Sequence, residues 1–225
     1  MSRSQDSPDL TQLRSEFSNR FAHLSIDLTD FEKISVSKID TQLNTSFGTS
    51  LKDVHLAAFV HNAGVLDIAR LADISQETLT KSFNIHVFSF IHLTQILLPY
   101  LRSAKGTIVG ISSGAATKAY TGWSAYCMSK ATMNMTVQCL AVEEPELTVL
   151  SLRPGVVETE MQAVIRETGE ERGMTNEDME KFKGLHSTGK LLSPDVPAQA
   201  VFQCVVRDLK DLSGQFIDYT DPRLQ

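Results

Sequence analysis

Short apolar runs rich in β-branched residues alternate with longer segments of helical periodicity along this chain. Runs without polar alternation indicate strands that are buried on both faces, and such strands form parallel sheets covered by helices on both sides. The pattern therefore predicts an α/β fold with a doubly wound parallel sheet. The expected strands are residues 20–26, 54–60, 106–112, 147–153 and 214–219.

The segments between these runs have the features of helices. Ser75 can cap a long helix that continues to about residue 104 and is apolar over more than half of its circumference. We expect such a helix to be buried against the sheet and against a second subunit. Asp30 is expected to cap an earlier helix. Residues 160–190 are charged and interrupted by glycines, which favours a mobile substrate flap.

The overall composition limits the class of protein and its partners. A length of 225 residues with 42% hydrophobic content fits one domain over residues 1–225. A net charge of -6 without a Lys/Arg cluster argues against a nucleic-acid or membrane partner. The three cysteines are too dispersed for a disulfide framework, which favours a cytoplasmic location, and the six histidines lack metal-ligand spacing. We therefore expect small molecules as ligands and no metal.

Two kinds of residue point to chemistry. In an open α/β sheet a ligand lies beyond the carboxyl ends of the strands, so the polar residues and glycines after the expected strands are candidates. Tyr126 and Lys130 lie four residues apart in an expected helix, so the phenol and the ammonium can reach one point and handle a proton. The ordinary alternative is a half-buried ring with a lysine that extends into water, and the spacing alone favours it.

Four motifs in order resemble the short-chain dehydrogenase/reductase family: "HNAG", "ISS", "YCMSK" and "PGVVET". The segments "SSGAATKAYTGWSAYCMSKA" and "EEPELTVLSLRPGVVETEM" are most similar to carbonyl reductases of the benzil-reductase and sepiapterin-reductase type. The resemblance implies a Rossmann-like fold, NADP (as NADPH), a small-molecule ketone, aldehyde or diketone substrate, and a homodimer or homotetramer. The alternative is a non-catalytic binding or regulatory protein that has lost the cofactor.

The resemblance also implies a role for each catalytic residue. Tyr126 would donate a proton to the substrate carbonyl, and Lys130 would lower the pKa of its phenol and bind the nicotinamide ribose. Ser113 would hydrogen-bond the substrate oxygen. Asn84 would hold a water that links Lys130 to solvent. We interpret Ser112 as a turn serine that bonds to its own backbone.

The remaining matched positions would bind the cofactor. The histidines His86 and His92 are not among them, and we interpret both as packing residues of the long helix. Arg3 and Ser4 would contact the 2′-phosphate, and Asp27 with Leu28 would contact the adenine. The adenine ribose would be lined by Asn62, Ala63 and Gly64. The nicotinamide carboxamide would be bound by Pro154, Gly155, Val157 and Thr159.

The glycine-rich turn that holds the pyrophosphate in this family has no counterpart, because the first glycine is Gly48. We therefore expect the fold to lack the first strand–helix–strand unit. Either the reading frame starts at an internal methionine of a longer protein, or this is a genuine short relative. The 225 residues alone are expected neither to bind a dinucleotide nor to form a stable domain.

Overall fold

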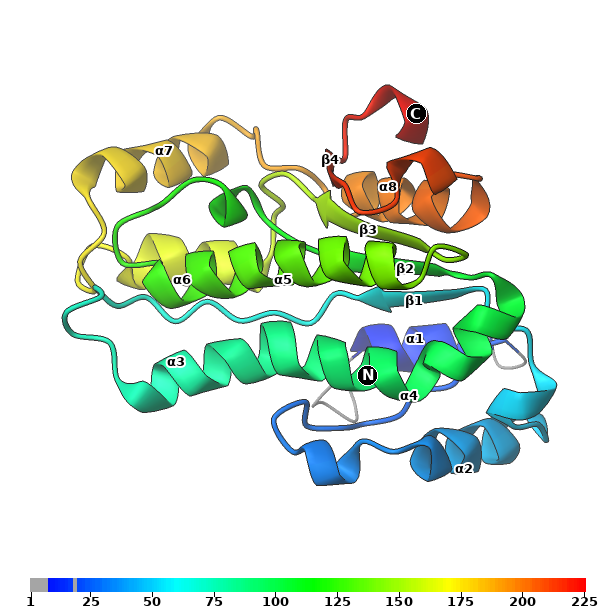
Figure 1. Cartoon of the computed structure of the whole chain (residues 1–225). Coiled ribbons are helices and arrows are strands. Elements are labelled where there is room, and N and C mark those ends of the chain that lie inside the picture. The colour runs from blue at the N-terminus through cyan, green and yellow to red at the C-terminus, as the bar shows by residue number, and fades with distance from the viewer. Residues whose placement is uncertain (1–7, 18–19) are drawn as a thin grey trace.

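A four-stranded parallel sheet forms the centre of the computed structural model, which describes residues 8–17 and 20–225 (Figure 1). The strands lie in the order β1-β2-β3-β4, and each neighbouring pair is parallel. The predicted α/β fold with a parallel sheet is confirmed. The strands are β1 (Ala58–His61), β2 (Thr107–Ile111), β3 (Thr148–Arg153) and β4 (Phe216–Asp218).

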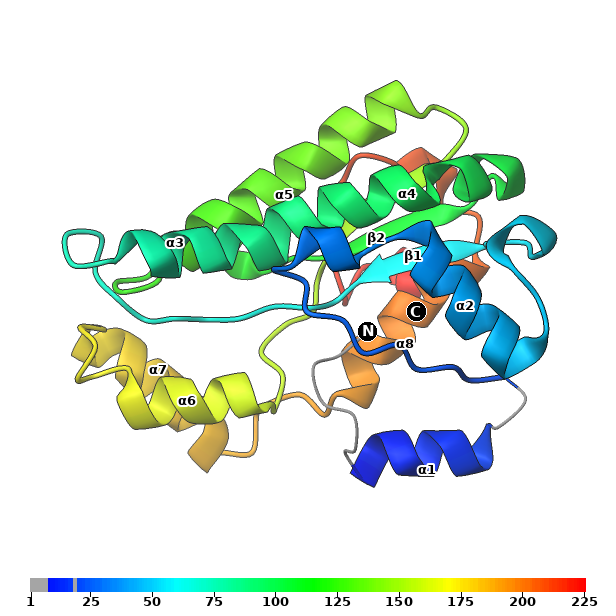
Figure 2. The same cartoon turned by 90° about the horizontal axis from the view of Figure 1, so that it is seen from below.

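Helices cover both faces of the sheet (Figure 2). One face carries α4 (Ser89–Ala104) and α5 (Ser124–Glu143), and Ile108 and Val149 pack there. Their neighbours Val109 and Leu150 pack on the opposite face with α8 (Asp195–Val206). Because successive strand residues point to opposite faces, both faces need apolar side chains, which explains the continuous apolar runs.

The expected long helix is present but contains a π-helical turn. Ser75 caps α3 (Gln76–Phe83) by accepting a hydrogen bond from the Thr78 amide at 3.0 Å, as predicted. A π-helix, η3 (Asn84–Phe88), then joins α3 to α4. Such turns rotate the following side chains relative to an uninterrupted α-helix.

The segment before β1 differs most from expectation. It contains α1 (Pro8–Glu16), the 3₁₀-helix η1 (Phe31–Lys33), α2 (Val36–Phe47) and η2 (Leu51–Asp53). The predicted strand at 20–26 is wrong, because only Ser25 there has a β-bridge. A strand needs a paired neighbour, and β1 lies at the edge of the sheet that the described residues form. Residues 24–28 instead pack on α4, with Ile26 against Leu93.

The expected cap of the helix before β1 is also wrong. The Asp30 side chain makes no capping hydrogen bond, whereas the Ser35 hydroxyl accepts one from the Lys38 amide and begins α2.

Two helices after β3 occupy the segment expected to form a flap. They are α6 (Glu160–Thr168) and α7 (Asn176–Ser187), which pack together at the left of Figure 1. The remaining 3₁₀-helices are η4 (Gly114–Ala116), η5 (Lys210–Leu212) and η6 (Pro222–Leu224). Residues 160–190 therefore form two helices joined by a turn, and both helices lie beyond the carboxyl ends of the strands.

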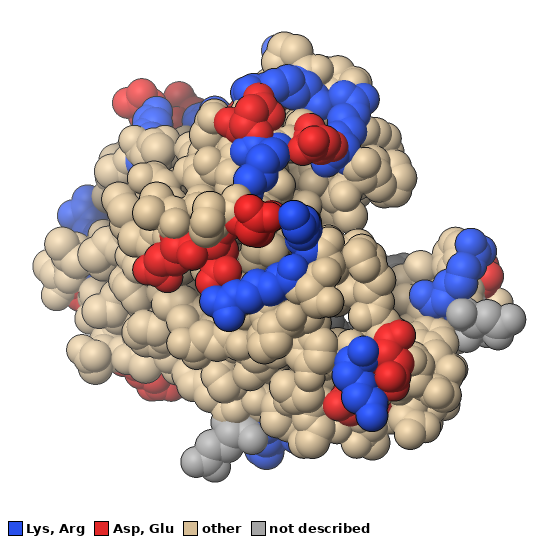
Figure 3. Space-filling view, turned by 45° about the vertical axis from the view of Figure 1, so that its right-hand side comes forward, with Lys and Arg blue, Asp and Glu red and all other residues tan. Residues whose placement is uncertain are grey.

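The surface mixes charges of both signs. Acidic and basic side chains lie next to one another on the face shown in Figure 3. Ion pairs along the described surface include Lys105–Glu146 at 2.7 Å. Within the described ranges, every helix is too short or too polar to cross a membrane.

Candidate active site

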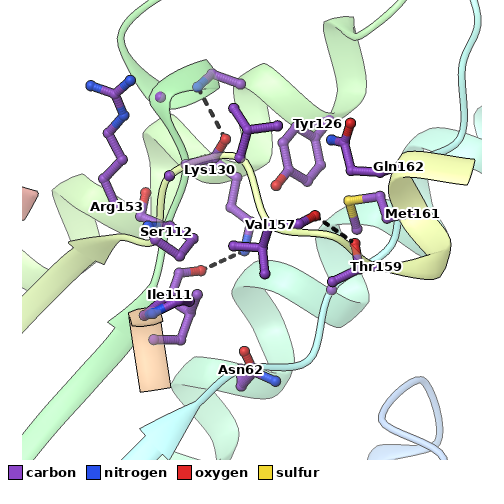
Figure 4. Close-up of a pocket in the computed structure, with 18 of the residues that line it drawn as sticks. Asn62, Ile111, Ser112, Tyr126, Lys130, Arg153, Val157, Thr159, Met161 and Gln162 are labelled. Carbon is purple, nitrogen blue, oxygen red and sulfur yellow. Dashed lines mark hydrogen bonds between the residues drawn. The ribbon is translucent and has the colours of Figure 1, made fainter. Parts of the chain in front are cut away.

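A cavity of about 700 Å³ opens at the carboxyl ends of β1, β2 and β3, where the topology places a ligand. Its wall combines the loops after these strands with residues of α5, α6, α7 and α8. Figure 4 shows Tyr126 and Lys130 of α5 and Met161 and Gln162 of α6 in this wall. Of the residues expected to act in catalysis or binding, those that line it are Asn62, Gly64, Ser113, Tyr126, Lys130, Pro154, Gly155, Val157 and Thr159.

Tyr126 and Lys130 face this cavity from α5. Both side chains are buried, with 8% and 3% exposure, and the Lys130 Nζ lies 5.8 Å from the centre of the Tyr126 ring. The Nζ donates a hydrogen bond to the Ile111 carbonyl at 2.7 Å (Figure 4). The lysine therefore does not extend into water, so the ordinary interpretation of the spacing is wrong for this pair.

Burial controls the charge of both groups. It raises the pKa of Tyr126, and a hydrogen bond with Ser113 opposes that rise only in part. Desolvation is therefore the larger effect on this pKa, and the expectation that Lys130 lowers it stays a prediction. Burial also lowers the pKa of Lys130 to about 7. Near neutral pH the phenol consequently retains the proton that a general acid must donate.

The hydrogen bonds of the two serines after β2 differ from those expected. Ser113 Oγ accepts a hydrogen bond from the Ala115 amide at 3.1 Å, so it makes the backbone contact that we assigned to Ser112. Its O–H remains free to donate toward Tyr126 or a ligand oxygen. Ser112 Oγ instead donates to Asn134 Oδ1 at 2.7 Å and ties β2 to α5.

His86 is fully buried and is not part of the cavity wall, which agrees with its interpretation as a packing residue, but it packs against the catalytic candidate Tyr126. Its ring meets the Tyr126 ring edge to face at 5.4 Å. Its Nε2 accepts a hydrogen bond from the Val65 amide at 2.9 Å, and its Nδ1 lies 2.8 Å from Ser129 Oγ. No local signal could reveal this, because the π-turn sets the direction of the ring. Asn84, at the start of that turn, is half-buried and outside the cavity wall, and its assigned role stays a prediction.

The other expected cofactor residues lie away from the cavity or outside the described residues. The Asp27 carboxylate accepts hydrogen bonds from the amide and hydroxyl of Thr29, and Leu28 packs with Ile26. Ala63 is not part of the cavity wall. Arg3 and Ser4 lie outside the described residues.

Two of the glycines that the family resemblance matches, Gly64 and Gly155, line the cavity. Gly155 has a φ of +78°, and a Cβ there would lie 2.5 Å from Leu192 Cδ1. A Cβ at Gly64 would lie 3.3 Å from His86 Nε2 and 3.8 Å from Lys130 Nζ. The bare backbone of Gly64 therefore borders the cavity next to the Lys130 ammonium, whereas the missing side chain at Gly155 makes room for Leu192 and Tyr219, which lie outside the cavity wall. Among the described residues, His, Cys, Asp and Glu form no group that could hold a metal ion.

Comparisons with known proteins agree with this geometry. The family model described as short chain dehydrogenase matches residues 2–170. Benzil reductase ((S)-benzoin forming) of Saccharomyces cerevisiae is 35% identical, over 96% of this chain and 83% of that protein. The Bacillus cereus benzil reductase is 32% identical, over 87% of this chain and 79% of the relative. The crystal structure of a Saccharomyces cerevisiae short-chain dehydrogenase/reductase superposes with a TM-score of 0.85 at 30% identity, covering 97% of this chain and 84% of that one.

The protein belongs to the short-chain dehydrogenase/reductase family. It is an oxidoreductase of that family, and membership implies a nicotinamide cofactor and a small-molecule substrate.

Proposed function

We propose that this protein reduces a ketone or aldehyde, with an aromatic 1,2-diketone as the favoured substrate, to an alcohol with NADPH. The burial of Tyr126 and Lys130 against one cavity, with Ser113 in its wall, carries the proposal. The names of two relatives, both benzil reductases, support the substrate class. So does an aromatic wall, in which the ring centres of Trp123 and Phe182 stack 5.3 Å apart.

The mechanism divides among the chain's own residues. A bound NADPH would supply the hydride. The Ser113 hydroxyl holds the carbonyl oxygen, and Tyr126 transfers its phenolic proton to that oxygen as the alcohol forms. Lys130 stabilises the phenolate that remains, because a positive charge one helical turn away favours the ionised form. The cavity wall excludes water from the reacting atoms.

The cofactor would be held by the same side of the cavity. Lys130 would reach the nicotinamide ribose, Asn62 would contact the adenine ribose, and the backbone from Pro154 to Val157 would border the carboxamide. The preference for NADPH rests on the sequence match of Arg3, whose guanidinium suits a 2′-phosphate. Dissociation constants for NADPH and NADH measured on the natural protein test it, and tighter binding of NADH would contradict it.

We also propose that residues 160–190 act as the substrate flap within a single domain. Met161, Ile165 and Phe182 of this segment line the cavity. They would cover the substrate on the side opposite the sheet.

The dispersed, unpaired cysteines support a cytoplasmic location.

Replacing Tyr126 with phenylalanine tests the central claim. Because Phe keeps the ring but lacks the proton, carbonyl reduction should fall by about 10²–10⁴-fold while NADPH binding persists. Tyr100→Phe, on α4 and outside the cavity wall, is the matched control. Turnover that survives in the Tyr126 variant would remove this residue from the mechanism, and a natural protein that binds no nicotinamide cofactor would favour a non-catalytic role.

A further inference from the structure

Arg153, the last residue of β3, lies against the turn that carries Ser113. A Cβ on Gly114, which follows Ser113, would lie 3.1 Å from Arg153 Nε, 3.5 Å from its Cζ and 3.6 Å from its Nη2. The missing side chain at Gly114 therefore makes room for the guanidinium. Arg153 and Gly114 both line the cavity, but Figure 4 shows the guanidinium directed away from Tyr126. Arg153 thus contacts the turn beside the reacting groups and not the Tyr126 phenol.

An ion pair with the neighbouring strand holds this guanidinium. Arg153 Nη1 lies 3.3 Å from Asp218 Oδ2 on β4. Asp218 Oδ1 accepts hydrogen bonds from the Thr220 amide at 3.0 Å and from the Thr220 hydroxyl at 2.8 Å, so the carboxylate is itself fixed. Half of the Arg153 side chain is exposed, and ion pairs with this exposure contribute little to stability. We therefore expect the main effect of the pair on the turn that the guanidinium contacts.

The position of this turn sets the direction of the Ser113 hydroxyl. Ser113 Oγ accepts a hydrogen bond from the Ala115 amide at 3.1 Å, and Gly114 is the residue between them. A shift of Gly114 would therefore move the hydroxyl relative to Tyr126, with which it is hydrogen-bonded. A displacement of about 1 Å in a group that positions a substrate can lower a rate by about 10²-fold.

We infer that Arg153 is a positioning residue for the Ser113 hydroxyl and that Asp218 holds it in this role. This inference rests on the proposed function, in which the hydroxyl holds the carbonyl oxygen. The guanidinium suits the role because its donors form a rigid, planar fork. Its Nη1 pairs with Asp218 while Nε and Nη2 face Gly114, so the turn cannot move toward the guanidinium without displacing it from the carboxylate.

Reduction of benzil with NADPH by the natural protein and its variants tests this inference. Arg153→Met removes the guanidinium, so kcat should fall about tenfold while the KM for benzil changes less than about twofold. Arg153→Lys keeps the charge but not the planar fork and should not restore kcat. Asp218→Asn keeps the shape and removes the ion pair, and should lower kcat about two- to threefold. Arg172→Met, at an exposed position outside the cavity wall, is the control and should leave kcat unchanged.

A double-mutant cycle separates positioning from a general structural role. In the Ser113→Ala background no hydroxyl remains to be positioned, so adding Arg153→Met should lower kcat by less than about a further twofold. A general disturbance of the cavity would slow both backgrounds by the same factor. Arg153→Gln replaces the methionine variant in both backgrounds if that variant does not fold.

Carbon-13 NMR of the Tyr126 Cζ, assigned with Tyr126→Phe, reports the hydrogen bond at the phenol without turnover. Arg153→Met should shift this signal in the same direction as Ser113→Ala does, and Arg172→Met should not shift it. A natural protein that does not reduce benzil would contradict the proposed function, whereas the NMR signal would still test the placement of Ser113. An unshifted signal, a raised KM at constant kcat, or equal effects of Arg153→Met in the two backgrounds would overturn the inference.

Discussion

At the scale of single residues, the hydrogen bonds of His86 determine its tautomer. The Val65 amide can only donate, so His86 Nε2 must present a lone pair to it. Burial lowers the pKa of His86 well below its ordinary value, and the nearby charge of Lys130 lowers it further. The ring is therefore neutral, carries its proton on Nδ1 and donates to Ser129 Oγ. Nitrogen-15 NMR of the imidazole should show this Nδ1–H tautomer from pH 6 to 8.

Replacing His86 with phenylalanine tests whether this ring positions Tyr126. The variant keeps a ring but loses two buried hydrogen bonds, so the free energy of unfolding should fall by about 1–3 kcal/mol. We expect kcat to fall about tenfold or more with little change in KM, because a shifted phenol affects the chemical step. His92→Phe removes a hydrogen bond to the Ile34 carbonyl outside the cavity and should leave kcat unchanged. Equal kcat values in both variants would contradict this role.

At the scale of elements, the loop after β3 depends on one glycine. Gly155 combines a φ of +78° with a Cβ position 2.5 Å from Leu192 and 2.7 Å from Tyr219. Gly155→Ala should therefore lower the free energy of unfolding by at least about 2 kcal/mol through strain and overpacking. Gly184, inside α7, has open space around its Cβ position, and Gly184→Ala should raise stability by about 0.5–1 kcal/mol. Urea unfolding of both variants measures the two changes in unfolding free energy, and changes of the same sign would contradict the prediction.

The same scale shows which elements a sequence predicts well. The expected strands at 106–112 and 147–153 contain β2 and β3, and each expected boundary lies within one residue of the observed one, because burial on both faces leaves a local signal. The segment 20–26 has a similar local pattern, but no strand among the described residues pairs with it. Tyr126 and Lys130 were found because helical spacing placed them together and the family motif "YCMSK" implied their roles. The contact of His86 with Tyr126 was not, since His86 lies in a π-turn that local sequence does not reveal.

At the scale of the whole molecule, an apolar stripe on α5 supports the predicted homodimer or homotetramer. Met128, Met135 and Val142 are exposed and seven residues apart, and Phe88 of the adjoining π-turn is exposed as well. Residues seven apart lie on one helical face, so a second copy could cover them together. Light scattering at micromolar concentration should show an oligomer, and Met135→Glu should shift it toward monomer. Val164→Glu, an exposed change on α6, is the control. A monomeric natural protein would contradict the prediction.

Stability of the whole molecule should fall in mild acid because His61 must remain neutral in the folded state. Its side chain is 2% exposed, its Nε2 bonds to Ser89 Oγ at 2.9 Å, and burial lowers its pKa to about 3. The unfolded chain binds this proton near pH 6.5, so between pH 6.5 and 3 unfolding takes up a proton and stability is lost as the pH falls.

His61 alone should lower the free energy of unfolding by about 2 kcal/mol at pH 5 relative to pH 7.5. In the unfolded chain its pKa of about 6.5 lies about 1.5 units above pH 5, and each unit stabilises the protonated unfolded state by about 1.36 kcal/mol. His61→Asn removes the titrating group, so the difference in unfolding free energy between pH 7.5 and pH 5 should shrink by that amount, measured by urea unfolding at both values. His55→Asn, at an exposed position just before β1, should leave the difference as it is in the unaltered protein. If the His61 and His55 variants lose the same stability between the two pH values, the buried imidazole is not the source of the acid sensitivity.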